Sequence, residues 1–213
     1  YREDPSLFTL VYAYPRISIP IILAVSMALL SLLLGILLVH SRKTKEIRVM
    51  SETDALTGLY NRRAAEDHIS RQMQEDGKNP DCVRPLISID LDKFKQVNDT
   101  YGHLEGDALL IAVADTLRTS VRSYDIVGRI GGDEFVVYLS NVTDRQNAMA
   151  VAEKLCQVIR GLSTMKKEWS NISASIGISF ADHPDIKMEE LYISADKAMY
   201  SAKGNGRDQY QTL

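Results

Sequence analysis

Residues 54–213 alternate between short apolar runs and stretches with helical periodicity. Strand patterns are predicted at residues 85–90, on either side of Gly131, at 171–180 and at 208–210. Helical patterns are predicted at residues 62–75, 106–122, 144–160 and 189–203. Strands that alternate with helices, together with one hairpin at Gly131, predict an α/β (α+β) sandwich in which helices flank a mixed sheet.

A different pattern occupies residues 17–39, a continuous apolar run without a charged side chain. The run is long enough to cross the roughly 30 Å hydrocarbon layer of a bilayer. A buried core helix is one alternative, but core helices rarely stay apolar on every side over this length. A cleaved signal peptide is a weaker one, because the run is long and residues 40–43 do not form a small-residue cleavage site. We therefore predict one transmembrane helix that contacts membrane lipid.

The charges around this run predict its orientation. Only one acid, Glu46, accompanies the basic residues that follow it, which are Arg42, Lys43, Lys45 and Arg48. The positive-inside rule places the C-terminal domain in the cytoplasm and the helix in the inner (cytoplasmic) membrane. Residues 1–16 are then expected to be an extracytoplasmic tail, the end of a truncated upstream region, and residues 40–53 a helical stalk. Small residues on one face of the span, Ala24, Ala28, Ser31 and Gly35, hint weakly at a dimer.

Composition removes several classes of function. The formal net charge is −3, which argues against a nucleic-acid partner because such proteins show a basic face. The two cysteines, Cys82 and Cys156, form no disulfide framework, and the four histidines lack the spacing of a zinc site.

The turn at residues 131–134, Gly-Gly-Asp-Glu, is the strongest chemical signal. Glycines allow a tight turn and a close approach to a ligand. The adjacent carboxylates Asp133 and Glu134 repel each other unless a cation lies between them, although a solvated acidic hairpin is the simpler interpretation of this turn alone. Asp90 ends the predicted strand at 85–90, at the position where α/β sheets bind ligands. These carboxylates are candidates for one oxygen-rich Mg²⁺ or Mn²⁺ site, but the sequence alone leaves their convergence open.

Further motifs complete a resemblance to the GGDEF diguanylate cyclase family over residues 51–210. In the family's order they are DALTGLYNRR (54–63), DLDKFK (90–95), ND (98–99), GH (102–103), GD (106–107), RIGGDEF (129–135), SIGI (175–178), ADKAMY (195–200), AK (202–203) and GR (206–207). The resemblance implies a palm-like sandwich with a mixed or antiparallel sheet, similar to that of nucleotide cyclases, over residues 54–213. It also implies condensation of two GTP into cyclic di-GMP with loss of two pyrophosphates.

Residue roles follow from the same resemblance. Asp90 and Asp133, with the Leu91 carbonyl, would bind a metal. Glu134 would bind a second metal or help deprotonate the attacking 3′-hydroxyl, so that Mg²⁺ or Mn²⁺ would occupy two positions per site. The substrate residues would be Lys93, Phe94 and Lys95 through backbone amides, Lys203 and Arg207 on the phosphates, Asn98 and Asp107 on guanine, and His103 and Arg129. For Asp107 the chemistry agrees, since a carboxylate accepts from both N1–H and the exocyclic amine of guanine.

Arg122 and Asp125 lie just before the signature and resemble the family's product-binding inhibitory motif. A surface ion pair between residues three apart is the alternative. The leading hypothesis is thus a membrane-anchored, homodimeric enzyme with product feedback inhibition. One competitor is a catalytically inactive GGDEF module that senses GTP or cyclic di-GMP, which the intact carboxylates disfavour. Another is a cyclase that uses one nucleotide or mixes ATP and GTP, which Asp107 disfavours.

Overall fold

The computed structural model describes residues 19–21, 23–36, 52–181 and 185–213. The chain divides into two compact units, Tyr1–Ser51 and Glu52–Leu213. In the first unit, the helix Ile19–Ile36 has a mean hydropathy of 2.6 over 18 residues and no buried share. Its length and composition would allow it to cross a membrane, although a signal sequence would meet the same criteria. The predicted tail at 1–16 and most of the predicted stalk at 40–53 lie outside the described residues.

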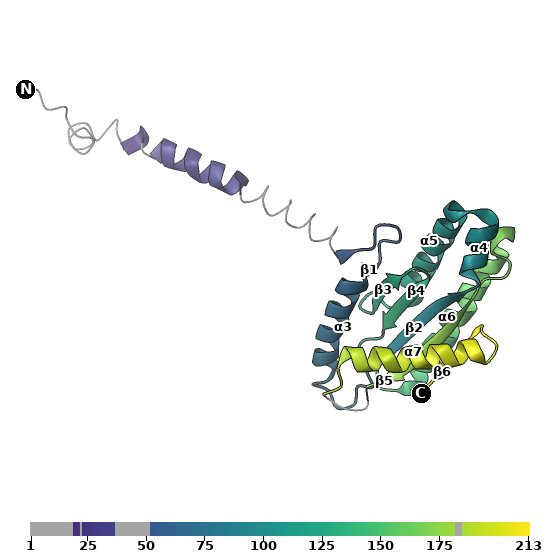
Figure 1. Ribbon diagram of the computed structural model, residues 1–213. Helices are drawn as coiled ribbons and strands as arrows, with labels where there is room; N and C mark the ends of the chain where they lie inside the picture. The colour runs from purple at the N-terminus through teal and green to yellow at the C-terminus, as the bar shows by residue number, and fades with distance from the viewer. Residues whose placement is uncertain (1–18, 22, 37–51, 182–184) are drawn as a thin grey trace, which may run out of the picture. The chain divides into compact units, whose positions relative to one another are not determined.

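The second unit is built on a six-stranded mixed sheet (Figure 1). Its strands are β1 (Tyr60–Asn61), β2 (Pro85–Asp92), β3 (Ile126–Gly131), β4 (Glu134–Tyr138), β5 (Ser173–Phe180) and β6 (Gln209–Thr212). They are arranged in the order β1-β3-β4-β2-β5-β6. The inner pairs β3–β4, β4–β2 and β2–β5 are antiparallel, while the edge pairs β1–β3 and β5–β6 are parallel. The predicted mixed sheet flanked by helices is confirmed.

Helices cover both faces of this sheet. They are α3 (Arg62–Asp76), α4 (Phe94–Tyr101), α5 (His103–Ser120), α6 (Arg145–Gly161) and α7 (Met188–Gly204), with short 3₁₀ turns at Leu162–Thr164 and Lys167–Trp169. One core lies beneath α3 and α7, and a larger one lies beneath α5 and α6. Figure 1 shows α7 crossing the sheet over β2 and β5. Both cores lie within Glu52–Leu213, so this unit has the apolar interior that an independently folding domain needs.

The alternation along β2 gives its two faces different chemistry. Ile87 and Ile89 point into the larger core, whereas Ser88, Asp90 and Asp92 share the face covered by α7. The strand continues to Asp92, two residues beyond the predicted end at Asp90. Asp90 therefore lies within the strand and is paired with Glu134 on β4 and Ser175 on β5.

Helix boundaries differ modestly from the predictions. The helix predicted from Gly106 begins at His103, directly after Gly102, whose φ of +87° separates α4 from α5. The predicted helices at 62–75, 144–160 and 189–203 are confirmed within one residue at each end. Asn61 and Asp144 begin α3 and α6 by accepting hydrogen bonds from the backbone N–H of Ala64 and Gln146.

Candidate active site

The signature residues form the turn between β3 and β4. Gly132 has φ of +42°, a left-handed conformation that glycine adopts without steric cost, and a register shift between Arg129 and Gly131 widens the turn. The Arg129 guanidinium closes the turn from within, since its Nε and Nη2 donate to the Gly132 carbonyl at 3.0 and 2.7 Å. The hairpin predicted around Gly131 is confirmed, and its tip carries Asp133 and Glu134.

Sheet register brings the acidic residues together. Asp90 on β2 is the direct partner of Glu134 on β4, and the Leu91 amide donates to the Asp133 carbonyl at 3.3 Å. Asp90 is 9% exposed, whereas Glu134 is exposed and Asp133 is half-buried. The three acids thus gather at one end of adjacent strands, although more than forty positions separate Asp90 from the other two in the sequence.

Their electrostatics reflect this proximity. Burial raises the pKa of the Asp90 carboxyl, a shift that Lys203 opposes and the charges of Asp133 and Asp92 reinforce. Burial also raises the pKa of Glu134, and the negative charges of Asp90 and Asp133 add to the increase. A cation at this position would relieve the repulsion that these carboxylates exert on one another.

Two basic side chains, one from the last turn of α7 and one from the segment after it, contact aspartates of β2. Lys203 Nζ lies 2.7 Å from Asp90 Oδ2, and Arg207 Nε lies 3.7 Å from Asp92 Oδ1. Both were predicted to contact phosphate; Lys203 contacts the acidic cluster at Asp90, whereas Arg207 contacts the neighbouring Asp92. Their contact with substrate phosphate stays a prediction.

Within the described residues, no three His, Cys, Asp or Glu side chains are arranged to hold a metal ion by themselves. Mg²⁺ needs fewer protein ligands, because it is commonly bound by one or two carboxylates together with substrate phosphates and water. Asp90, Asp133 and Glu134 are oxygen donors of this kind, and the Leu91 carbonyl belongs to the residue that follows Asp90. The donor set therefore fits Mg²⁺ or Mn²⁺ completed by a nucleotide.

The predicted guanine residues lie together on α4 and α5. Asn98 Oδ1 is buried and has no hydrogen-bond partner among the described residues. A Cβ atom at Gly106 would overlap this oxygen, so the glycine makes room for the Asn98 side chain. The half-buried Asp107 follows Gly106 directly, and His103 is exposed in the first turn of α5. An unsatisfied buried acceptor beside a carboxylate suits a ligand with several N–H donors.

The residues predicted to bind phosphate through their backbone amides lie at the start of α4. Lys93 has φ of +61° and precedes Phe94, the first residue of the helix. Lys93 and Lys95 are exposed and Phe94 is half-buried. The first turn of a helix has free N–H groups, and this turn follows β2 directly, close in sequence to Asp90. Such groups can hold phosphate oxygens, as the prediction requires.

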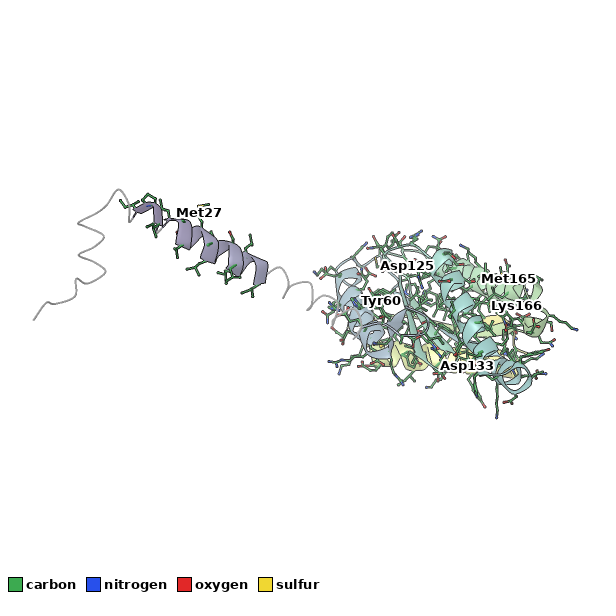
Figure 2. The ribbon with its side chains drawn as sticks, turned by 90° about the horizontal axis from the view of Figure 1, so that it is seen from above. Met27, Tyr60, Asp125, Asp133, Met165 and Lys166 are labelled. Carbon is green, nitrogen blue, oxygen red and sulfur yellow. The ribbon has the colours of Figure 1, made fainter. Side chains whose placement is uncertain are left out.

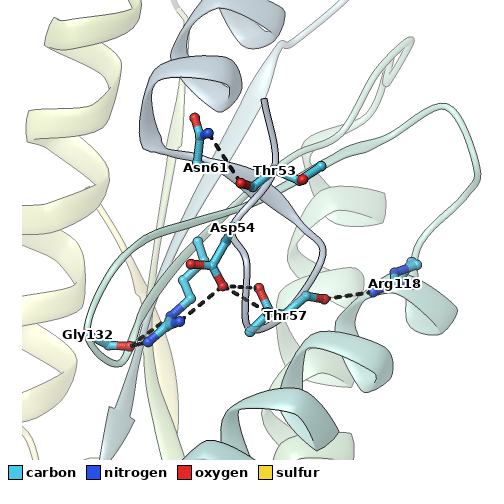
Figure 3. A network of polar contacts seen from close by, with 7 residues as sticks. Thr53, Asp54, Thr57, Asn61, Arg118 and Gly132 are labelled. Atoms are coloured by element: carbon cyan, nitrogen blue, oxygen red, sulfur yellow. Dashed lines mark hydrogen bonds and ion pairs between the residues drawn. The ribbon is translucent and has the colours of Figure 1, made fainter. Parts of the chain in front are cut away.

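Arg129 was predicted to contact substrate, and that role stays untested. Its Nη1 donates to Asp54 Oδ1 at 3.0 Å, and the same oxygen accepts from the Thr57 amide at 2.9 Å and the Thr57 hydroxyl at 2.6 Å (Figure 3). Arg118 in turn donates to the Thr57 carbonyl at 3.1 Å. This network joins the opening motif at Asp54 to the signature turn.

The predicted product-binding residues lie away from the acidic turn, as the positions of Asp125 and Asp133 in Figure 2 show. Asp125 accepts from the backbone amides of Arg122 at 2.8 Å and Ser140 at 3.0 Å. The Arg122 guanidinium instead donates to the Tyr124 hydroxyl at 2.9 Å and is exposed. A cavity of about 360 Å³ borders Arg122 and Asp125, and Lys154 also lines it. The alternative of a simple side-chain ion pair does not describe this arrangement.

Sequence reasoning missed the part played by Asp92. Its side chain is 1% exposed, and its two carboxylate oxygens accept from the hydroxyls of Ser173 and Ser175, both at 2.7 Å. The signal was available, because alternation along a strand places Asp92 on the same face as Asp90.

Comparison with known proteins then decides the family. The protein-family model described as "Diguanylate cyclase, GGDEF domain" matches residues 51–209. The chain belongs to the GGDEF family. Its second unit is therefore a GGDEF domain, and the recognition made from the motifs is confirmed.

Similar proteins are found in several bacteria. The chain is 39% identical over 170 residues to the bifunctional diguanylate cyclase/cyclic di-GMP phosphodiesterase MucR of Pseudomonas aeruginosa, covering 80% of this chain and 24% of that protein. It is 34% identical to the diguanylate cyclase DgcS of Shewanella oneidensis, over 82% of this chain and 57% of that protein. The chain thus spans between a quarter and somewhat over half of these relatives.

A solved structure agrees with the fold. The GGDEF domain of DgcB from Caulobacter crescentus, in complex with cyclic di-GMP, matches with a TM-score of 0.69 and 26% identity. The match covers 76% of this chain and 95% of that one.

Proposed function

We propose that this chain is a diguanylate cyclase that condenses two GTP into cyclic di-GMP and two pyrophosphates. The observation that carries the proposal is the direct pairing of Asp90 with Glu134 beside Asp133, with Lys203 2.7 Å from Asp90. Phosphoryl transfer requires such a cluster of anionic metal donors next to cationic phosphate partners.

When bound by Asp90, Asp133, Glu134 and the Leu91 carbonyl, Mg²⁺ or Mn²⁺ would neutralise developing charge on the phosphates. Lys203 and Arg207 hold the outer phosphates, together with amides at the start of α4. Asn98 and Asp107 accept the N–H groups of guanine. Glu134 binds a second metal ion or accepts the proton of the 3′-hydroxyl.

Each half-reaction forms one bond and breaks one. The 3′-oxygen of one GTP bonds to the α-phosphorus of the other, the bond between the α-phosphorus and the bridging oxygen breaks, and pyrophosphate leaves. The 3′-hydroxyl proton passes to the general base. Two such events close the ring, and each requires two nucleotides face to face, so the active form is a homodimer of GGDEF domains.

The direct test supplies purified residues 1–213 in detergent with GTP and Mg²⁺. We expect a product with the mass of cyclic di-GMP and two pyrophosphates for each product molecule. A Glu134→Gln variant and a reaction with ATP in place of GTP are the controls. GTP binding without any product would favour the inactive sensing module, and cyclic GMP as product would favour a single-nucleotide cyclase.

Residues 17–39 are proposed to anchor the enzyme in the inner membrane, with the GGDEF domain in the cytoplasm. The support is the apolar helix Ile19–Ile36 and the basic residues after it. The full chain should remain in the membrane pellet after alkaline extraction, whereas residues 52–213 expressed alone should be soluble. Full release of the longer chain would contradict the anchor.

Feedback inhibition is proposed at Arg122 and Asp125. The exposed Arg122 guanidinium offers a planar set of donors for guanine or phosphate beside a cavity. Replacing Arg122 by Ala should weaken inhibition by added cyclic di-GMP by about tenfold, since a charged hydrogen bond contributes roughly 1.5–3 kcal/mol. Initial turnover should remain. Arg63→Ala, which removes another exposed arginine, should leave the inhibition curve in place.

A further inference from the structure

The Asp92 carboxylate is one of the most completely enclosed charged groups in the described part of the chain. The residue is 3% exposed, and it accepts the Ser173 and Ser175 hydroxyls from β5. Its Oδ2 also accepts the backbone amide of Asp208 at 3.1 Å. Because its oxygens already receive three donors and it faces the interior, Asp92 is not placed to bind a metal shared with a nucleotide.

The segment held by Asp92 has an unusual backbone. Gly206, Arg207 and Asp208 have φ of +110°, +66° and +52°, so two consecutive non-glycine residues are left-handed. Such residues cost on the order of 1–3 kcal/mol each and persist only where surrounding contacts hold them. Residues 206–208, just after α7, are therefore held in one conformation, which could position a side chain accurately.

A second anchor holds the segment from the other side. Arg160 at the end of α6 donates through Nε to Asp208 Oδ2 at 2.7 Å and through Nη2 to the Asp208 carbonyl at 3.2 Å. Asp208 therefore donates its backbone amide to Asp92 and accepts hydrogen bonds from Arg160 at its side chain and carbonyl. Arg207 directly precedes Asp208, so these contacts constrain its backbone, while its side chain is 55% exposed.

We propose that Asp92 and Arg160 are positioning residues that hold residues 206–208 so that Arg207 is presented to the outer phosphates of the nucleotide. The inference rests on the proposed function, in which Lys203 and Arg207 contact those phosphates. Asp92 lies 3.7 Å from Arg207 Nε, so it also limits the orientation of that side chain. The two aspartates of the DLDKFK motif then have separate tasks, Asp90 toward the metal and Asp92 toward the phosphate-binding segment.

The test compares two probes on the full chain in detergent with Mg²⁺. One probe, 3′-deoxy-GTP, carries the phosphates but lacks the attacking hydroxyl, and the other is GMP, which lacks the outer phosphates. Asp92→Asn should weaken 3′-deoxy-GTP binding about tenfold and change GMP binding less than about twofold. Removing a negative charge would by itself strengthen phosphate binding, so a loss of affinity reports lost positioning.

Arg160→Gln provides an independent variant on the surface, where misfolding is not expected, since the Arg160 side chain is 48% exposed. We expect a loss of about threefold, again for 3′-deoxy-GTP alone. The matched control is Asp76→Asn, because Asp76 is equally buried at 3% and accepts from Tyr138 and Gln72 at another position of the domain. It should lower stability while keeping the ratio of the two affinities.

Arg207→Ala separates this inference from the proposed function. If Arg207→Ala loses 3′-deoxy-GTP affinity and both anchor variants keep the wild-type ratio, the positioning role is wrong and the proposed function stands. Tighter 3′-deoxy-GTP binding by Asp92→Asn would likewise overturn it. If Arg207→Ala has no effect, the phosphate contact of the proposed function fails, and the inference fails with it.

Discussion

Arg129 connects two distant parts of the GGDEF domain through a single guanidinium. Two of its nitrogens donate to the Gly132 carbonyl, and a third donates to Asp54. Asp54 is held in turn by the amide and hydroxyl of Thr57. The position of Asp133, the residue after Gly132, thus depends on an ion pair that begins at the first motif of the domain.

The Asp54 ion pair should make stability depend on pH. Burial raises the pKa of Asp54, but hydrogen bonds from Thr57 and the charge of Arg129 outweigh it, so the pKa is lowered overall. A lowered pKa adds stability above the unfolded value of about 3.9, and this stability is lost as the pH falls through the folded pKa. Asp54→Asn should therefore cost about 1–2 kcal/mol at pH 7 and progressively less below pH 4.

Urea unfolding of residues 52–213, measured from pH 7 to pH 3 for wild type and variant, checks this dependence. A difference in unfolding free energy that is constant over the whole range would contradict the assignment.

The metal hypothesis makes Asp133 the most sensitive residue for activity. Asp133→Asn should reduce turnover by about a hundredfold or more, equivalent to roughly 3 kcal/mol of transition-state stabilisation. Its unfolding free energy should change by less than about 1 kcal/mol, because a half-buried turn residue contributes little to the core. Initial rates with GTP and Mg²⁺ measure the effect, and Asp81→Asn, an exposed acid elsewhere, is the control. Turnover like that of wild type would exclude Asp133 as a metal ligand.

Among the elements, α7 packs closely against the sheet. It crosses β5 at Gly177, where an added Cβ atom would overlap the Ala195 carbonyl and the Met199 amide. Ser179 on the same strand donates to the Leu191 carbonyl at 2.7 Å. These contacts fix the distance between α7 and β5. The last turn of α7 then brings Lys203 to Asp90.

Gly177→Ala should therefore displace α7. Both overlapping groups are backbone atoms that cannot rotate away, so we expect a loss of about 3 kcal/mol in unfolding free energy. Activity should fall as well, because Lys203 moves with the helix. Gly161→Ala is the control, since Gly161 has a helical backbone and open space at its Cβ position, and it should be neutral or slightly stabilising. Denaturant unfolding measures the free energy of unfolding of both variants. Equal values would contradict close packing of α7 on Gly177.

On the scale of the whole molecule, one domain carries one acidic cluster and one predicted guanine site, whereas the proposed product contains two nucleotides. In the proposed reaction, two copies would therefore have to meet. A membrane anchor at residues 17–39 would confine the chains to a surface and raise their effective concentration.

Dilution tests this requirement. Residues 52–213, which lack the apolar helix, should show turnover per molecule that rises with protein concentration, approaching zero where sizing detects only monomer. A dimeric coiled coil placed before Glu52 should restore activity at low concentration in at least one register. Constant specific activity of the monomer would mean that one domain completes the reaction alone.

The sequence by itself determined most of the elements and the family. Hydrophobic periodicity is a local property, so the helices at 62–75 and 144–160 and the hairpin at Gly131 could be predicted with small errors at their ends. The order of the motifs identified the GGDEF domain, and the acidic turn indicated metal-dependent chemistry. Boundaries set by single backbone angles, such as the break at Gly102, were predicted less well.

Only the tertiary structure decided which residues distant in sequence lie in contact. It pairs Asp90 with Glu134 and Lys203, places the buried Asn98 oxygen against Gly106, and turns Arg129 toward Asp54. It also shows that Asp92, two residues from Asp90, faces Ser175 and the segment before β6. The physical reason is that hydrogen bonds and ion pairs depend on distances of a few ångströms in three dimensions, which sheet register and helix packing set and local sequence patterns do not encode.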